Sequence, residues 1–158
     1  MTKTNAMRAL DQRGIVYTPI TFAPTIHSGD GVAAAIGEPA ARVFKTLVVL
    51  RERGRPLLVI IPSDRELDLK RCAAAVGEKR VRMASQKEAE TLTGLLVGGI
   101  SALALLGKDF TVYLDSSSMH WEELYVSAGQ RGINLRLRPT DLIHVTGAQV
   151  IDLEDLQT

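Results

Sequence analysis

The chain is poor in the residue types that most often build catalytic and metal sites. Its 158 residues include one cysteine and three histidines. A single cysteine excludes an internal disulfide, and the histidines stand far apart, without the spacing of metal ligands, at His27, His120 and His144. The patterns HExxH, CxxC, GxSxG and GxxxxGK[ST] are also absent, which leaves no familiar metal, nucleophile or phosphate-loop motif. We therefore expect neither a metal nor a cofactor.

Strong charge and long apolar runs are missing as well. The formal net charge is +1 at pH 7, which excludes a strongly basic protein that coats nucleic acid. Any nucleic-acid partner must then be held by local patches. No stretch is apolar over the length that spans a bilayer, and the N-terminal MTKTNAMRALDQRG has no apolar signal core. The sequence predicts a cytoplasmic protein without a membrane partner.

The few residues of catalytic type have structural interpretations. Cys72 falls on the apolar face of an expected helix and is interpreted as a small core residue. His120 fits a surface loop, and His144 fits a helix end, where it interacts favourably with the helix dipole. His27 precedes an expected helix, and a ligand contact is the weaker of its two interpretations.

Apolar periodicity and turn residues divide the chain into short helices and strands. Helices are expected at 6–12, between His27 and Gly37, and at 68–76, 85–93 and 139–147. Strands are expected at 15–22, 43–50, 56–62, 81–84, 110–115, 123–129 and 134–139, with 148–153 as a closing strand or coil. Pro19 indicates an edge strand, and the turn RERGRP predicts a hairpin. Helix 68–76 should bury one face made of Leu69, Cys72, Ala73 and Val76.

These elements predict an α+β fold. Strands in several hairpins, with helices between them, favour a mixed, partly closed, barrel-like sheet flanked by helices. No repeat, low-complexity segment or linker interrupts the sequence, and 158 residues suit one domain with a sizeable core. Residues 1–158 are therefore expected to form a single compact domain.

One charged residue stands inside a strongly apolar expected strand. In VFKTLVVL, residues 43–50, Lys45 carries the single full charge. An unpaired buried ammonium is costly, so Lys45 either reaches water at the strand end or lines a site that uses its charge. VGGIS, residues 97–101, has adjacent glycines that can aim N–H groups at an oxygen, and YVSAGQRG, residues 125–132, ends in small residues. Each segment also has a plain interpretation as a strand or turn.

The motifs FKTLVV, LDLKR, LTGLLVGGIS and LYVSAGQRG, followed by DL, occur in this order along the chain. Together they resemble the YbaK/EbsC family of free-standing aminoacyl-tRNA deacylases, which is related to the editing insertion domain of bacterial prolyl-tRNA synthetase. The resemblance runs from about Ala6 to Asp152. It implies a mixed α/β domain and a metal-independent hydrolase. Such enzymes remove a wrong amino acid from tRNA, often cysteine, alanine or another small residue from tRNA for proline.

The resemblance also implies roles for particular residues. Lys45 would face a phosphate of the terminal adenosine, or otherwise hold the tRNA end. Gly98 and Gly99 would offer backbone N–H groups to the aminoacyl carbonyl. An aminoacyl ester is already activated, so positioning and backbone hydrogen bonds, with a water, a ribose hydroxyl or the substrate's own side chain, can suffice. The implied substrate-binding residues are Phe22, Thr46, Ile100, Ser101, Ser127, Gly129 and Asn134. The implied partners are the 3′ end of aminoacyl-tRNA and prolyl-tRNA synthetase.

Three positions depart from the pattern of the family. Ala102 follows GGIS where proline is common, Phe22 stands near a frequent tyrosine, and Asn134 stands where many members have aspartate. Two hypotheses therefore remain open. The chain is a trans-editing deacylase, or it is a module on the same fold that holds a tRNA end or a synthetase without turnover. Basic clusters at 51–55, 79–82 and 136–138 fit either phosphate contacts or solvated turns.

Overall fold

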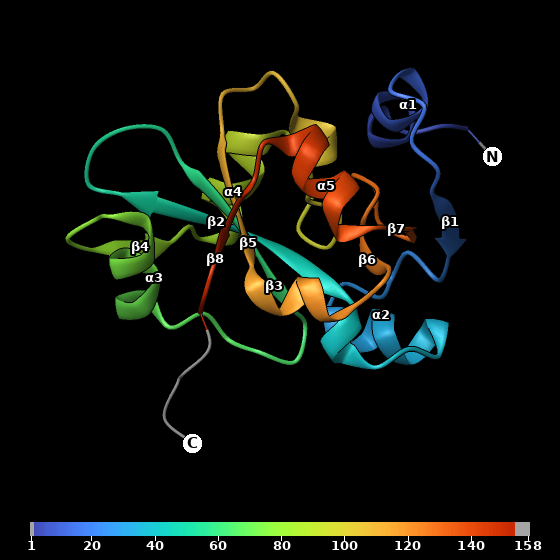
Figure 1. The fold of residues 1–158 in the computed structure, drawn as a ribbon, viewed down its shortest axis with the longest axis horizontal. Helices are drawn as coiled ribbons and strands as arrows, with labels where there is room; N and C mark the ends of the chain where they lie inside the picture. The colour runs from blue at the N-terminus through green and yellow to red at the C-terminus, as the bar shows by residue number, and fades with distance from the viewer. Residues whose placement is uncertain (1, 154–158) are drawn as a thin grey trace.

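The computed structural model describes residues 2–153, so Met1 and residues 154–158 lie outside the described part. Helices and short strands alternate along the chain (Figure 1). The α-helices are α1 (Asn5–Gln12), α2 (Gly29–Ile36), α3 (Leu69–Val76), α4 (Gln86–Thr93) and α5 (Pro139–Thr146). The strands are β1 (Thr18–Thr21), β2 (Phe44–Arg51), β3 (Leu57–Pro62), β4 (Val81–Met83), β5 (Thr111–Asp115), β6 (Leu124–Ser127), β7 (Ile133–Leu137) and β8 (Gln149–Ile151). Short 3-10 helices are η1 (Ala40–Arg42), η2 (Leu103–Leu105) and η3 (Ser116–His120).

Capping side chains fix where the helices begin, as their sequence signals predict. At α4, Ser85 and Glu88 form a capping box, in which each side chain accepts a hydrogen bond from the other residue's backbone N–H. Ser28 caps α2 and Asp68 caps α3 through their side-chain oxygens. Gly37 ends α2 with a left-handed backbone, φ 73°.

A five-stranded sheet forms the centre of the molecule, with the strand order β4-β2-β3-β5-β8. The β2–β3 hairpin is confirmed, with Lys45 opposite Ile61 and Leu47 opposite Val59. Strand β5 runs parallel to both β3 and β8, so the sheet is mixed as expected. Every residue of β3 is buried, because β3 lies inside the sheet and both of its faces are covered.

The second sheet is small and antiparallel, with the order β1-β7-β6, and Pro19 lies in its edge strand as predicted. A parallel bridge between Val43 and Tyr125 joins the two sheets. The expectation of a partly closed barrel is wrong. The outer strands β4 and β8 of the large sheet are only three residues long, and within residues 2–153 neither pairs on its outer side to close a ring.

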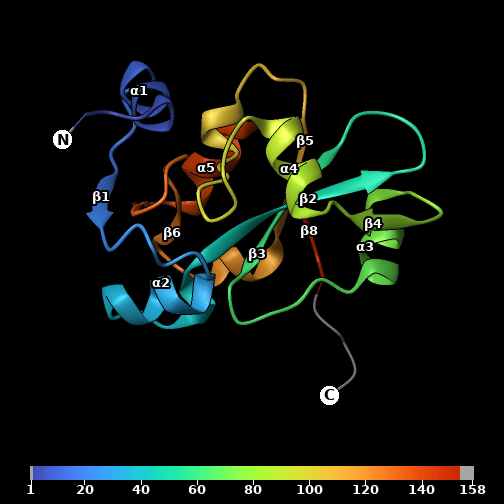
Figure 2. The same ribbon diagram turned by 180° about the vertical axis from the view of Figure 1, so that it is seen from behind.

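The main core fills the space between the two sheets and the helices that cover them. It includes Leu10 of α1, Leu58 of β3 and Leu135 of β7, each fully buried. Figure 2 shows α2, α4 and the loop that follows α4 on one face of the molecule. That face carries the candidate site.

Helix α3 covers the opposite face of the large sheet and departs partly from its expected pattern. Cys72 and Ala73 are buried there as predicted, and burial raises the pKa of the Cys72 thiol to about 11. The predicted burial of Leu69 is wrong, because its side chain is 36% exposed. Leu69 follows the N-cap directly, in the exposed run Asp68–Lys70, and the contact with the sheet begins one turn later.

Candidate active site

A cavity of about 440 Å³ opens between α2, the edge of β2, the N-terminus of α4 and the loop after α4. Six of the residues named from the sequence line it: Lys45, Thr46, Gly98, Ile100, Ser127 and Asn134. They come from four separate stretches of the chain, which the fold brings to one place. Phe22, Gly99, Ser101 and Gly129 are not among the lining residues.

Lys45 is partly exposed in the first half of β2, and its ammonium has little to pair with. Nζ donates to the backbone carbonyl oxygen of Ser63 at 3.4 Å. Within residues 2–153, no carboxylate lies at ion-pair distance from it. A half-buried cation with one weak carbonyl partner keeps most of its hydrogen-bonding capacity for a ligand. Lys45 therefore borders a cavity and also retains access to water.

The N-terminus of α2 packs beside this lysine. Gly29 leaves no room for a side chain, because a Cβ there would collide with Ser63, whose carbonyl oxygen accepts from Lys45. Ser28, Gly29 and Asp30 line the cavity. A helix N-terminus is the positive end of the helix dipole and adds to the charge of Lys45, while the Asp30 carboxylate in the same turn opposes both.

The two glycines after α4, Gly98 and Gly99, differ in their contacts. Gly98 lines the cavity with φ +94°, and a Cβ on it would lie 3.2 Å from the Cα of His27. Gly99 donates its N–H to the carbonyl oxygen of Leu96 at 2.8 Å, and a Cβ on it would lie 2.9 Å from the backbone nitrogen of Arg131. Gly99 therefore shapes the loop. The N–H of Gly98 meets no acceptor among the described residues.

Two polar side chains from the small sheet border the same cavity. Ser127 of β6 and Asn134 of β7 are cross-strand neighbours. The Ser127 Oγ accepts the N–H of Gly129 at 3.1 Å and keeps its own hydrogen free to donate. Asn134 is only 5% exposed, and its amide makes no hydrogen bond to any part of residues 2–153. Asn134 lines the cavity, so its amide can donate to and accept from a polar ligand there.

The remaining named residues support the site from behind. Phe22 packs against a cluster that includes Val32 and Tyr125. Ser101 is 1% exposed, and its Oγ accepts the N–H of Ala104 at 3.2 Å. A Cβ on Gly129 would lie 2.8 Å from the Cβ of Ala104, so that glycine allows close packing of two loops.

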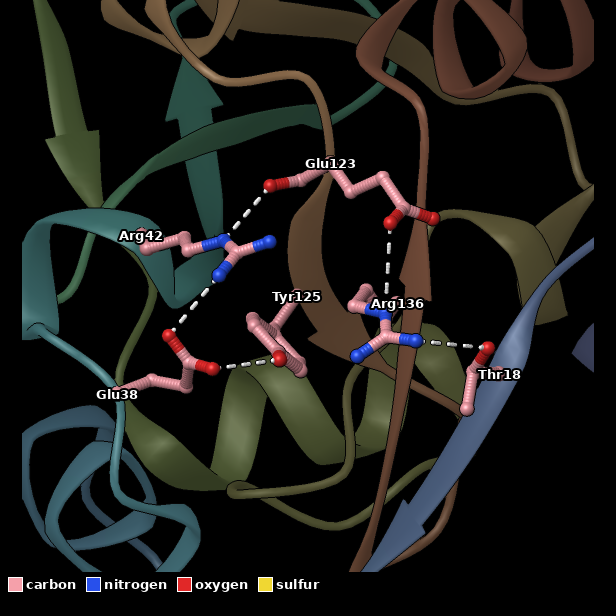
Figure 3. Close-up of polar contacts among 6 residues, drawn as sticks. All are labelled: Thr18, Glu38, Arg42, Glu123, Tyr125 and Arg136. Atoms are coloured by element: carbon pink, nitrogen blue, oxygen red, sulfur yellow. Dashed lines mark hydrogen bonds and ion pairs between the residues drawn. The ribbon is translucent and has the colours of Figure 1, made fainter.

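The start of β2 is fixed by a network of side chains that the sequence did not reveal (Figure 3). Arg42, which directly precedes the bridge residue Val43, donates to the backbone oxygen of Glu123 at 2.9 Å and to the carboxylate of Glu38 at 3.0 Å. Its guanidinium also lies over the ring of Tyr125, 5.1 Å from the centroid. The network joins η1 to the small sheet and comprises Thr18, Glu38, Arg42, Glu123, Tyr125 and Arg136.

Several lining residues were also missed from the sequence: Asp30, Ser63 and the segment 83–86. The N-cap patterns at Ser28 and Ser85 are the signals that could have found two of these walls, since both helices start at the cavity. The basic clusters are largely paired in the structure. Arg51 contacts Glu78, Arg80 contacts Glu52, and Arg82 contacts Glu88.

Comparison with known proteins decides the family. Residues 23–145 match the model of the aminoacyl-tRNA editing domain. The chain belongs to the aminoacyl-tRNA editing domain family. This editing domain is 36% identical over 153 residues to an Enterococcus faecalis protein named "Putative Cys-tRNA(Pro)/Cys-tRNA(Cys) deacylase EbsC", a match that covers 96% of this chain and 93% of that protein.

Two further similarities place the editing domain among free-standing and fused relatives. A crystal structure described as "a putative trans-editing enzyme for prolyl tRNA synthetase" is 27% identical, with a TM-score of 0.82, and covers 98% of this chain and 99% of that one. A proline–tRNA ligase of Shouchella clausii is 29% identical over 109 residues, which are 69% of this chain but 19% of the ligase. The match therefore covers a small part of that ligase but nearly all of the trans-editing enzyme.

In residues 2–153, no group of three or more histidine, cysteine, aspartate or glutamate side chains is placed to hold a metal ion. Over the same residues, no helix is long and apolar enough to cross a membrane.

Proposed function

We propose that this editing domain hydrolyses mischarged aminoacyl-tRNA in trans, on tRNA for proline that carries cysteine, alanine or another small amino acid. The observation that carries the proposal is the pairing of two groups on one cavity. Lys45 offers an ammonium without a carboxylate partner, and Gly98 offers an N–H without an acceptor, within the described residues. Both are ready for the oxygens of a substrate.

Lys45 would hold the end of the tRNA. The phosphodiester oxygens near the terminal adenosine are strong acceptors for an ammonium, and a partly desolvated pair of this kind is stronger than one in water. The N-terminus of α2 adds a favourable field beside it. Through these contacts the fold would fix the ester in the cavity, and positioning of that kind lowers the barrier to reaction.

Gly98 would act on the reacting carbonyl. Water adds to the carbonyl carbon, the bond to the ribose oxygen breaks, and the amino acid and a free ribose hydroxyl leave. Negative charge gathers on the carbonyl oxygen during this reaction, and a fixed N–H stabilises it. The ester is activated by its own chemistry, so we propose that no metal takes part.

The inner wall of the cavity would select the amino acid. Ile100 offers an apolar contact, while Ser127 and Asn134 offer groups that both donate and accept hydrogen bonds. A site lined in this way suits a short side chain, either apolar or with one small polar group.

We extend the proposal to the whole chain. Residues 1–158 would act as one editing domain in the cytoplasm, with prolyl-tRNA synthetase as a partner that supplies charged tRNA. The first and last described elements pack with the rest of the domain. Helix α1 buries Ala6 and Leu10 in the main core, and β8 pairs with β5.

A second function has some support from the chain itself. Phe22, Ala102 and Asn134 depart from the pattern of the resembling family, and these changes favour a module that binds a tRNA end or a synthetase without turnover. The cavity and Lys45 would serve such a module equally well.

A deacylation panel separates the two functions. tRNA for proline is charged with cysteine, alanine, serine or a small non-protein amino acid, and the decay of each ester is followed with and without the protein. We expect faster decay for at least one ester. Binding of the tRNA together with decay at the buffer rate across the panel would favour the module.

A further inference from the structure

The backbone of β2 faces its two neighbours alternately, and two hydrogen bonds show which residues face which side. The N–H of Ser63 donates to the carbonyl oxygen of Val43 at 2.8 Å, so Val43 faces β3. The N–H of Ala84 donates to the carbonyl oxygen of Val48 at 3.0 Å, so Val48 faces the β4 side. Because backbone groups alternate along an antiparallel strand, Lys45 and Leu47 face β3, and Thr46 faces the β4 side.

Among the described residues, no strand pairs with Thr46 on that side. Strand β4 pairs with β2 only from Val49 to Arg51, and the contact ends at Val48. On the other flank, β6 touches the strand at Val43 through Tyr125. Between Val43 and Val48, no strand of the described residues pairs with β2 on this side, and we call the open backbone position at Thr46 the Thr46 notch. The N–H and the carbonyl of Thr46 therefore face this unpaired edge, and Thr46 lines the cavity.

An open strand residue offers a donor and an acceptor at a fixed spacing. In an antiparallel pair, it exchanges two hydrogen bonds with one facing residue, N–H to carbonyl in both directions. An aminoacyl group is such a residue, because its ammonium and its carbonyl flank a single Cα. Peptides bind to open sheet edges by the same rule.

We propose that the Thr46 notch binds the aminoacyl group of the substrate as a one-residue strand. The Thr46 carbonyl oxygen accepts a hydrogen bond from the α-ammonium, and the Thr46 N–H donates to the ester carbonyl oxygen. This inference rests on the proposed function and deepens it, since it makes a free α-amine a requirement of the substrate.

The notch also orients the side chain of the amino acid. Facing residues of a strand pair point their side chains to the same face. The neighbours of Thr46 along that face, Phe44 and Val48, belong to the main core together with Ile100. An L-amino acid in the notch would therefore direct its side chain toward Ile100. Lys45 points to the other face, where it is free to hold the tRNA end.

A proline at the notch tests the donor. Thr46→Pro removes the N–H, and the large sheet loses no hydrogen bond, because that N–H faces the open edge. The matched variant Thr46→Val keeps the N–H and loses only the hydroxyl. We expect kcat/KM for Thr46→Pro to be about tenfold to a hundredfold below that of Thr46→Val, the range for a hydrogen bond to a developing charge. Equal values in two folded variants, as judged by thermal unfolding, would overturn the inference.

A change in the substrate tests the acceptor and does not depend on how a variant folds. tRNA esters of alanine and of propionic acid differ by the α-amine, and each enzymatic rate is divided by the rate of the same ester in buffer. We expect the acceleration for the propionyl ester to be lower by about tenfold to a hundredfold. Equal acceleration of both esters overturns the inference alone, while no acceleration of either overturns the proposed function as well.

Asp30 is the alternative partner for the substrate's ammonium. Among residues 2–153, it is the carboxylate residue that lines the cavity. In Asp30→Asn, the ratio between the alanyl and the propionyl ester should stay as in the unaltered protein. A ratio near one in this variant would show that Asp30 holds the ammonium, and the assignment to Thr46 would be wrong.

Discussion

Arg131 donates from Nε to the carbonyl oxygen of Val97 at 2.7 Å, and so ties the β6–β7 turn to the residue before Gly98. The same loop is held from its other side, where the side chain of Glu90 accepts the N–H of Val97 at 2.8 Å. Two side chains thus clamp one residue, and through it they set the position of the Gly98 N–H.

Arg131→Met should loosen this clamp and leave the core intact. We expect kcat to fall by about tenfold, because a catalytic group displaced by a fraction of an ångström loses much of its effect, while KM changes little. Steady-state kinetics on a mischarged tRNA measures both constants. An unchanged kcat would mean that Gly98 does not depend on Arg131.

Lys45→Ala should remove the charge that we propose holds the tRNA end. We expect turnover to fall by about ten- to a thousandfold, the scale of losing a few kcal/mol of electrostatic stabilisation. Folding should survive, since the ammonium contacts only the carbonyl oxygen of Ser63. Lys70→Ala is the matched control, because Lys70 is exposed on α3, away from the cavity. A folded Lys45→Ala protein with full activity would end this assignment.

Protonation of Glu88, at the start of α4, should lower the stability of the folded protein at acid pH. Its hydrogen bond with Arg82, together with that from the backbone of Ser85, lowers the pKa of the carboxyl from 4.5 to about 2. A lowered pKa in the folded state adds stability that is fully present above pH 4.5 and is lost as the pH falls toward about 2.

Thermal unfolding at several pH values tests this. Glu88→Gln should unfold with a shallower pH dependence between pH 4.5 and about 2 than the unaltered protein. Glu66→Gln, which changes an exposed carboxylate outside any helix, is the control and should keep the steeper dependence. Identical slopes for the unaltered protein and Glu88→Gln would contradict the role of this carboxylate.

The order of the elements could be predicted because its signals are local. The capping box at Ser85 and the apolar strand around Lys45 are each contained in a few residues, and the structure confirms both elements. The division into two sheets depends on pairing between distant segments, such as Val43 with Tyr125, and periodicity along the chain does not report it.

Part of the candidate site could likewise be predicted from local sequence, and part could not. Lys45 and Gly98 stand out in the sequence, one by its charge in an apolar strand and one by its glycine neighbour. The Thr46 notch depends on where β4 stops pairing, which only the register of the sheet shows. Gly99 was grouped with Gly98 because adjacent glycines look alike, yet its N–H is already bound to Leu96.

The specificity should differ from that of cysteine-directed members of the resembling family. Asn134 is buried and neutral where many members carry aspartate, so attraction of the substrate's ammonium should be weaker and the preference among small side chains broader. An apolar pocket separates single methylenes by only ~10–200-fold. The backbone at Ala102, with φ −63°, already has the conformation of proline.

Restoring the family pattern tests this prediction. Ala102→Pro combined with Asn134→Asp should shift the ratio of kcat/KM values toward cysteine over alanine and serine. The single variant Ala102→Pro serves as the control for loop stiffness alone. If the unaltered protein already prefers cysteine strongly and the double variant leaves the ratio unchanged, these two positions do not set the specificity.

The most direct measurement is the single-turnover decay of alanyl-tRNA and cysteinyl-tRNA for proline, with correctly charged prolyl-tRNA alongside. The account predicts that the protein shortens the lifetime of at least one mischarged ester about tenfold or more relative to buffer. A tenfold effect corresponds to an activation barrier lowered by about 1.4 kcal/mol. It also predicts that Lys45→Ala removes this effect. Decay of every ester at the buffer rate, with the folded protein in excess over tRNA, would contradict the central claim that the cavity hydrolyses mischarged tRNA.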